Sequence, residues 1–313
     1  MIYFPPAKIN LGLKVLEERE DGFHNIESVF LPTQLCDVLE VHKLDNGNIG
    51  ELKFECSGIE IVGDIENNTV IKAHQLLAEK FELPALEAKL HKIIPTGAGL
   101  GGGSADGSFM LKAINEICQL GLSVDSLEEF AAELGSDCPF FVKNIPAIVT
   151  GRGEKLNPIP VASEKLRFEE LMILIIHPNV HVNTSSAFSW LKDAKGNNSQ
   201  DDAQRVQLSS NLKKLDYCNL LETPIESWND LIVNEFQQPI ANRFPQINKA
   251  LKLIDDSDAD YFQMTGSGSS VYGLYKSVKT EKTLKVSKIT QNALKVIKKA
   301  RKEGFFAYFG ALA

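Results

Sequence analysis

The chain has 313 residues, 43% of them hydrophobic and 24% charged, and its formal net charge is -8. A single hydrophobic core seldom serves a chain of this length, so we expect two domains. The acidic balance disfavours a nucleic-acid-binding module, although it does not exclude a local basic pocket for an anionic small molecule.

The first half of the chain is predicted to be rich in strands. Lys8–Leu16 alternates apolar and polar residues, and the polar turn Glu17–Gly22 that follows it indicates a hairpin. Further strands with the same alternation are predicted at Val29–Leu31, Asp37–Lys43, within 47–58, at Leu86–Ile94 and at Ala147–Thr150. Apolar residues recur with helical spacing in three segments, Asn68–Phe81, Ser104–Leu120 and Leu127–Leu134.

The second half begins with Leu171–His177, a continuous apolar run of strand length that is typical of a central strand. We place the domain boundary near 157–165, which gives domains 1–160 and 161–313. Residues 193–211 are polar and poor in large apolar side chains, so we expect a loop or mobile insertion there. The remaining predictions are helices at Leu231–Phe236, Ile247–Ile254 and Glu281–Lys302, and strands at Tyr261–Met264, Val271–Tyr275 and Phe305–Ala311.

The cysteine content and the hydropathy of the sequence indicate the cellular location of the protein. Five cysteines form no Cys-x-x-Cys pair and no cluster with histidine, so neither a disulfide framework nor a zinc site is predicted. Residues 1–15 contain no basic segment followed by a long apolar run, and no later segment is long enough to span a bilayer. We expect a cytoplasmic protein without a membrane or nucleic-acid partner. The sequence leaves open whether it is a monomer or a homodimer.

The segment 94–115 places six glycines ahead of and inside the start of an amphipathic helix. Glycines allow successive amide N–H groups to turn towards an anion, and a helix N-terminus adds its own unpaired N–H groups, so this stretch predicts a phosphate cradle. The alternative is a loose loop whose glycines only relieve crowding. A Walker A loop needs a lysine that Gly103-Ser104-Ala105 does not supply, and a dinucleotide site needs a buried strand before the loop, whereas here Lys89 and Lys92 alternate with apolar residues.

The loop Pro95–Ser104 resembles the phosphate loop of the superfamily of galactokinase, homoserine kinase, mevalonate kinase and phosphomevalonate kinase. Within this superfamily the chain is similar to one family, the 4-diphosphocytidyl-2-C-methyl-D-erythritol kinases. The segments that carry this resemblance occur in the same order along almost the whole chain: Pro6–Leu11, Asp21–His24, Gly101–Asp106, Leu134–Phe141 and Met264–Ser270.

The resemblance implies an α+β, two-domain small-molecule kinase fold. An N-terminal α/β domain would bind ATP, a C-terminal α+β, ferredoxin-like domain would lie on the substrate side, and the active site would occupy the cleft between them. It also implies an ATP- and Mg²⁺-dependent transfer of phosphate to the 2-hydroxyl of 4-diphosphocytidyl-2-C-methyl-D-erythritol, in the non-mevalonate route to isoprenoid precursors. The alternatives are another alcohol kinase of the superfamily and a non-catalytic nucleotide-binding regulator.

The resemblance assigns catalysis to Asp137 and Lys8. By residue type alone, Asp137 would be the N-cap of a helix that begins near Pro139, and Lys8 would be a solvated surface charge. The residues implied to bind ATP are Pro95, Gly97, Gly99, Leu100, Gly101, Gly102, Gly103 and Ser104. The Ser104 hydroxyl is also the candidate metal ligand, or otherwise a helix cap. Asp106 reads equally well as an acid in the first turn of that helix.

The acceptor side is implied to include Asn10, Phe23, His24, Asp137, Thr184, Phe188, Gly266, Ser267 and Gly268. His24 would meet the edge of the cytosine, and Phe23 and Phe188 its faces. The family usually has tyrosine at position 23, so this chain would lose a hydroxyl contact and keep the stacking. By residue type alone, these three side chains would be a turn histidine and core aromatics. Gly266–Ser270 reads as a hairpin turn or as a second anion loop, and 151–154 as a turn without chemistry.

Overall fold

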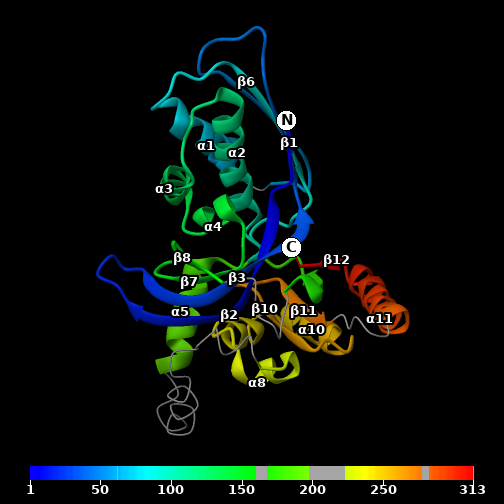
Figure 1. Ribbon diagram of the computed structural model, residues 1–313. Helices are drawn as coiled ribbons and strands as arrows, with labels where there is room; N and C mark the ends of the chain where they lie inside the picture. Colours follow the sequence, from blue (N-terminus) through cyan, green and yellow to red (C-terminus); the bar gives the residue numbers. More distant parts are fainter. Residues whose placement is uncertain (62, 160–167, 197–222, 277–281, 313) are drawn as a thin grey trace.

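The computed structural model describes residues 1–61, 63–159, 168–196, 223–276 and 282–312. Three four-stranded sheets organise this part of the chain (Figure 1). In sheet order, the first contains β1 (Ile2–Tyr3), β4 (Val38–Lys43), β6 (Leu86–Lys92) and β5 (Leu52–Gly58). The second contains β2 (Pro6–Glu18), β3 (His24–Cys36), β7 (Ala147–Thr150) and β8 (Lys155–Pro158). The third contains β10 (Tyr261–Met264), β11 (Val271–Lys276), β9 (Leu171–His177) and β12 (Phe306–Ala311).

The helices gather in two groups, one at each end of the view in Figure 1. The upper group is α1 (Thr69–Ala78), α2 (Gly102–Cys118), α3 (Val124–Leu134) and α4 (Cys138–Lys143). The lower group is α5 (Thr184–Gly196), α8 (Trp228–Leu231), α9 (Gln237–Ala241), α10 (Pro245–Asp255) and α11 (Lys282–Lys302). Short 3-10 turns lie at η1 (Ile65–Asn67), η2 (Phe168–Glu170) and η3 (Ile225–Ser227). No helix among the described residues has the length and hydropathy that a bilayer span requires.

The position of strand β9 in the core explains why its sequence is apolar throughout. Ile173 and Ile175 pack into a core cluster that also contains residues of β2 and β3, whereas Leu174 and Ile176 pack on the other face against residues of α5 and α10. Both faces of the strand are therefore buried, and neither face can be polar. The prediction of a central strand at this position is confirmed.

The long hairpin of β2 and β3 carries the N-terminal motif into the middle of the molecule, where it crosses the view of Figure 1. The strand expected at Val29–Leu31 is part of the 13-residue β3, because polar residues at its ends concealed the longer pairing. Alternate residues of β2, among them Ala7, Ile9 and Leu11, pack with β9 and β11 in one core cluster. The N-terminal hairpin and the C-terminal sheet are thus held together by apolar contact.

The helix predicted at Leu231–Phe236 was wrong. Helix α8 ends at Leu231, and Asn234 instead forms a parallel bridge with Leu13 of β2. The Leu13 N–H donates to the Val233 carbonyl at 3.0 Å, and the Glu235 N–H donates to the Leu13 carbonyl at 2.9 Å. Because β2 supplies these partners, the backbone satisfies its polar groups without a helical turn.

The other differences are smaller. Helix α2 begins at Gly102, two residues before the predicted start. Strand β8 was not predicted, and it pairs with β7 after the turn at 151–154. The predicted loop 193–211 begins inside helix α5, which ends at Gly196, and the rest of it from residue 197 lies outside the described residues.

Candidate active site

A pocket of about 1070 Å³ opens where β2, the glycine loop and the C-terminal turns meet. Single-ligand sites usually measure about 300 to 1,000 Å³, so this pocket has room for a nucleotide and a second substrate. It is lined by nearly every residue that the sequence nominated: Lys8, Asn10, Phe23, His24, Pro95, Gly97, Gly99, Gly101, Gly102, Gly103, Ser104, Asp137, Thr184, Phe188, Gly266, Ser267 and Gly268. Leu100 is the exception, because its side chain is buried in the core while its carbonyl accepts a hydrogen bond from the Lys8 N–H.

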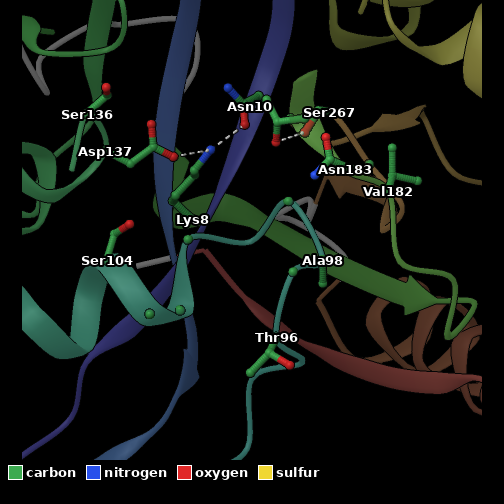
Figure 2. A pocket seen from close by; sticks show the side chains of 18 of the residues that line it. Lys8, Asn10, Thr96, Ala98, Ser104, Ser136, Asp137, Val182, Asn183 and Ser267 are labelled. Atoms are coloured by element: carbon green, nitrogen blue, oxygen red, sulfur yellow. Dashed lines mark hydrogen bonds and ion pairs between the residues drawn. The ribbon is translucent and has the colours of Figure 1, made fainter. Parts of the chain in front are cut away.

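Lys8 and Asp137 form the charged centre of the pocket. The Lys8 Nζ lies 3.2 Å from Asp137 Oδ2 and donates to Asn10 Oδ1 at 2.6 Å, as Figure 2 shows. It also lies 4.2 Å from the centroid of the Phe30 ring. Lys8 is only 3% exposed, so it is not the solvated surface charge that its residue type suggested. Burial among an acid, an amide and an aromatic face fixes the ammonium group in one place.

Asp137 occupies the N-cap position of α4, but its side chain does not cap that helix. Its backbone is helical rather than extended, and no side-chain capping hydrogen bond is present. Its side chain is 32% exposed and points to Lys8. The predicted N-cap position is therefore confirmed but the capping hydrogen bond is not formed, and the carboxylate is available to a ligand in the pocket.

A layer of polar side chains that the sequence analysis did not identify holds Asn10 in place. The side-chain Nδ2 of Asn10 donates to Ser28 Oγ at 3.1 Å, and the backbone carbonyl of Asn10 accepts from the Tyr272 hydroxyl at 2.8 Å. Its backbone N–H donates to Thr265 Oγ1 at 3.0 Å. These partners come from β3 and from both sides of the C-terminal turn, so they connect Asn10 to both halves of the chain. These partners are distant from Asn10 in the sequence, so only the folded structure reveals them.

The glycine loop leads directly into the N-terminus of α2. Gly101 is the N-cap with a φ of 71°, and no side chain caps the helix. Ser104 therefore lies within the first turn, and the interpretation of Ser104 as the cap is wrong. The uncapped end of α2 leaves first-turn N–H groups next to the pocket, which Gly101 to Ser104 line. This is the arrangement by which helix N-termini bind phosphate.

Gly99 brings the loop against the C-terminal turn, and we expect Gly99→Ala to destabilise the protein. Its φ is +77°, and an added Cβ would lie 2.4 Å from the Thr265 carbonyl oxygen. The left-handed backbone and the clash together should cost more than about 2 kcal/mol of unfolding free energy, measured by urea denaturation.

Gly103→Ala is the matched control for this substitution. Gly103 is helical, and its added Cβ would meet only Thr69 Oγ1 at 3.9 Å. We expect it to be neutral or stabilising, because alanine favours a helix over glycine. Equal stability losses in the two variants would contradict the close approach of Gly99 to the Thr265 carbonyl.

A buried group of three charges lies behind the phosphate loop. The Lys92 Nζ donates to Asp106 Oδ2 at 2.7 Å and to Asp37 Oδ2, and all three side chains are at most 2% exposed. Burial raises the pKa of Asp106 to about 7, against the opposing charge of Lys92. Asp106 is thus the partner of Lys92 and not an acid placed for the helix dipole. The group ties β6, α2 and the start of β4 together beneath the glycine loop.

The far end of the pocket is aromatic. The rings of His24 and Phe188 stack with centroids 4.9 Å apart and an interplanar angle of 22°. Phe23 is 53% exposed, and the Arg152 guanidinium carbon lies 4.9 Å from its ring centroid. Thr184 approaches this end from α5, where its hydroxyl lies 3.2 Å from that of Ser267. The aromatic residues nominated by the sequence are brought together here, but Arg152 was not among them.

The turn between β10 and β11 presents only part of its polar groups to the pocket. The hydroxyls of Ser269 and Ser270 lie 3.2 and 3.3 Å from His177 Nδ1, away from the pocket lining. Burial lowers the pKa of His177 to about 4, with the charge of His181 as a further cause, so the ring is neutral and can accept a hydrogen bond at Nδ1. Gly266, Ser267 and Gly268 face the pocket, and His177 fixes the turn from behind.

Comparison with known proteins identifies the family of this chain. Residues 68–145 match the GHMP kinases N terminal domain. A 4-diphosphocytidyl-2-C-methyl-D-erythritol kinase of Bacteroides fragilis is 40% identical over 275 residues, which cover 88% of this chain and 92% of that protein. The corresponding kinase of Salinibacter ruber is 32% identical over 275 residues, with 87% and 88% covered.

Solved structures give the same result. A crystal structure of 4-(cytidine 5'-diphospho)-2C-methyl-D-erythritol kinase superposes with a TM-score of 0.75 at 25% identity, covering 100% of this chain and 99% of the other. The Methanococcus jannaschii mevalonate kinase shares the fold at 14% identity, with a TM-score of 0.69 and coverage of 100% and 98%. The predicted kinase fold is thereby confirmed. The identities and coverages place this chain in the family of 4-diphosphocytidyl-2-C-methyl-D-erythritol kinases.

Proposed function

We propose that this kinase transfers the γ-phosphoryl group of ATP to the 2-hydroxyl of 4-diphosphocytidyl-2-C-methyl-D-erythritol, giving the 2-phosphate and ADP. The observation that carries the proposal is the Lys8–Asp137 ion pair. It lies in one pocket with the uncapped N-terminus of α2 and with the stacked rings of His24 and Phe188 at the aromatic end. We further propose that 1–160 form the ATP-binding domain and 161–313 the substrate-side domain. The reaction would serve the non-mevalonate route to isoprenoid precursors.

Phosphoryl transfer depends mainly on positioning and on neutralising charge on the moving group. Asp137 would orient the acceptor hydroxyl and receive its proton, because its carboxylate is partly exposed to the pocket and forms no capping hydrogen bond. Lys8 would attract the transferring phosphoryl group, and Asn10 keeps the ammonium in position. The glycine loop from Gly97 to Gly103 would hold the ATP phosphates with the N–H groups of the first turn of α2.

The donor types in the pocket fit a magnesium ion that is brought in with ATP. Mg²⁺ prefers oxygen ligands and takes one or two from the protein, the others coming from phosphates and water. Ser104, in the first turn of α2, lines the pocket, and we propose its hydroxyl as the protein ligand. The ion would neutralise charge on the phosphates.

The acceptor's cytidine would lie at the aromatic end, with His24 at the base edge and Phe23 and Phe188 against its faces. Thr184, Asn10 and the turn at Gly266, Ser267 and Gly268 would line the path between base and reacting hydroxyl. Phenylalanine at position 23 can stack, but it has no hydroxyl to donate.

An ADP-release assay with Mg-ATP tests this proposal. The acceptors compared are 4-diphosphocytidyl-2-C-methyl-D-erythritol, methylerythritol phosphate without the cytidyl group, homoserine and mevalonate. Turnover confined to the first is the expected result. Comparable turnover of homoserine or mevalonate would mean another alcohol kinase of the superfamily, and no turnover of any would mean a nucleotide-binding regulator.

A further inference from the structure

The turn between β7 and β8 places Arg152 on the wall of the pocket. Gly151 and Gly153 on either side of it have φ values of +72° and +127°. The Gly151 carbonyl accepts from the Ile26 N–H at 2.7 Å, and the backbone N–H of Arg152 donates to Glu154 Oε2 at 2.6 Å. The turn is therefore hydrogen-bonded to β3 and stabilised by the Glu154 carboxylate. Arg152, which lies in this turn, lines the pocket.

The guanidinium group of Arg152 is held by an aromatic face and not by an acid. Its carbon lies 4.9 Å from the centroid of the Phe23 ring. In the described part of the chain it forms no ion pair. The nearby Asp21 is already bound by Arg19, whose hydrogen bonds lower the pKa of that carboxyl, and the charge of Arg152 contributes to the same lowering. Stacking leaves the N–H groups at the rim of the guanidinium plane free to bind a ligand.

The other two cations of the pocket are neutralised by acids. Lys8 is paired with Asp137, and Lys92 bridges Asp37 and Asp106. Arg152 is thus the cation in the described pocket lining whose charge no acidic side chain at ion-pair distance balances. The positive charge of Arg152 is therefore available to attract an anionic group of a ligand in this pocket.

The turn that carries Arg152 reaches both ends of the pocket. A Cβ on the neighbouring Gly153 would lie 3.3 Å from Asp137 Oδ1, while Arg152 itself contacts Phe23. The turn therefore runs from the carboxylate of the reacting end to the ring of the aromatic end. In a cytidyl-diphosphate acceptor, the diphosphate is the group that joins these ends.

We propose that Arg152 binds the diphosphate of the acceptor and so selects nucleoside-diphosphate acceptors over uncharged ones. The inference rests on the proposed function for the orientation of the acceptor in the pocket. Arginine suits this role, because its planar fork can bind two phosphate oxygens while its face remains on Phe23. The arginine would act on binding of the acceptor and not on the transfer step.

The test uses Arg152→Gln and Arg152→Lys in the full chain, with Arg243→Gln as the matched control. Arg243 also stacks on an aromatic ring, that of Trp190 at 5.1 Å, but it lies outside the pocket lining. We expect Arg152→Gln to raise the KM for the acceptor by about 10- to 100-fold with little change in kcat or in the KM for ATP. Arg152→Lys should fall between it and the wild type, and Arg243→Gln should match the wild type.

Calorimetric titration with CDP and with cytidine, at a saturating concentration of a non-hydrolysable ATP analogue, separates this inference from the proposed function. The wild type should prefer CDP, and Arg152→Gln should lose that preference while it keeps its affinity for cytidine. An equal loss of affinity for both ligands, or an unchanged preference for CDP, would overturn the role of Arg152. A wild type that shows the Arg152-dependent preference but no turnover of the cytidyl acceptor would count against the proposed function alone.

Discussion

Asp137→Asn is expected to lower kcat by about 10³-fold or more while the KM values for ATP and acceptor stay near those of the wild type. The amide cannot accept the proton of the acceptor hydroxyl, and it removes the carboxylate that faces Lys8 at 3.2 Å. The effect should appear in the rate of transfer, because the glycine loop and the aromatic end of the pocket are unchanged. Steady-state measurement of ADP release, with each substrate varied in turn, gives the three constants.

Asp125→Asn is the control for this substitution. Asp125 is an exposed acid in the first turn of α3, outside the pocket lining, so its removal should leave kcat unchanged. A thermal unfolding scan of each variant establishes that the protein is folded. If Asp137→Asn retained more than a tenth of the wild-type kcat, the carboxylate would not be the group that positions or deprotonates the hydroxyl.

Lys92→Met should cause a large loss of stability, about 3 to 5 kcal/mol of unfolding free energy. The substitution leaves Asp37 and Asp106 facing each other in the interior without a counter-charge. Asp37 Oδ1 also accepts from the backbone N–H groups of Ile93 and Ile94, so the chain just before the glycine loop depends on this carboxylate. Urea denaturation at neutral pH measures the loss.

Lys89→Met on the same strand is the matched control. Lys89 pairs with Glu87 at 3.3 Å, but its side chain is 44% exposed, so the change should cost less than about 1 kcal/mol. Replacing both acids by asparagine in the Lys92→Met background should recover part of the stability, because no buried charge then remains unpaired. A loss for Lys92→Met no larger than that for Lys89→Met would contradict the account of the buried group.

Much of this site could be predicted because its residues occur in local patterns. The glycine run before a helix indicates a phosphate loop from backbone chemistry alone, and in the structure this run leads into the uncapped start of α2. The apolar run of β9 indicated a strand buried on both faces, and the two core clusters on either side of it explain the pattern.

The features that were missed depend on contacts between distant segments. In the sequence Lys92 is one of two lysines that alternate with apolar residues in a predicted strand, and only the fold brings Asp37 and Asp106 to it. The turn at Arg152 carries no motif, and its relation to Phe23 arises from the pairing of β3 with β7. The segment after Leu231 has helical spacing, but β2 offers its backbone better partners than another helical turn would.

The most direct test of the central claim is a proton-coupled ³¹P NMR spectrum of the product made by the wild type from Mg-ATP and 4-diphosphocytidyl-2-C-methyl-D-erythritol. The carbon at position 2 carries a methyl group and no hydrogen, so a phosphate on its hydroxyl has no proton three bonds away. We expect a new phosphomonoester singlet that grows as ATP is converted to ADP. A proton-coupled multiplet, or no new phosphomonoester, would contradict it.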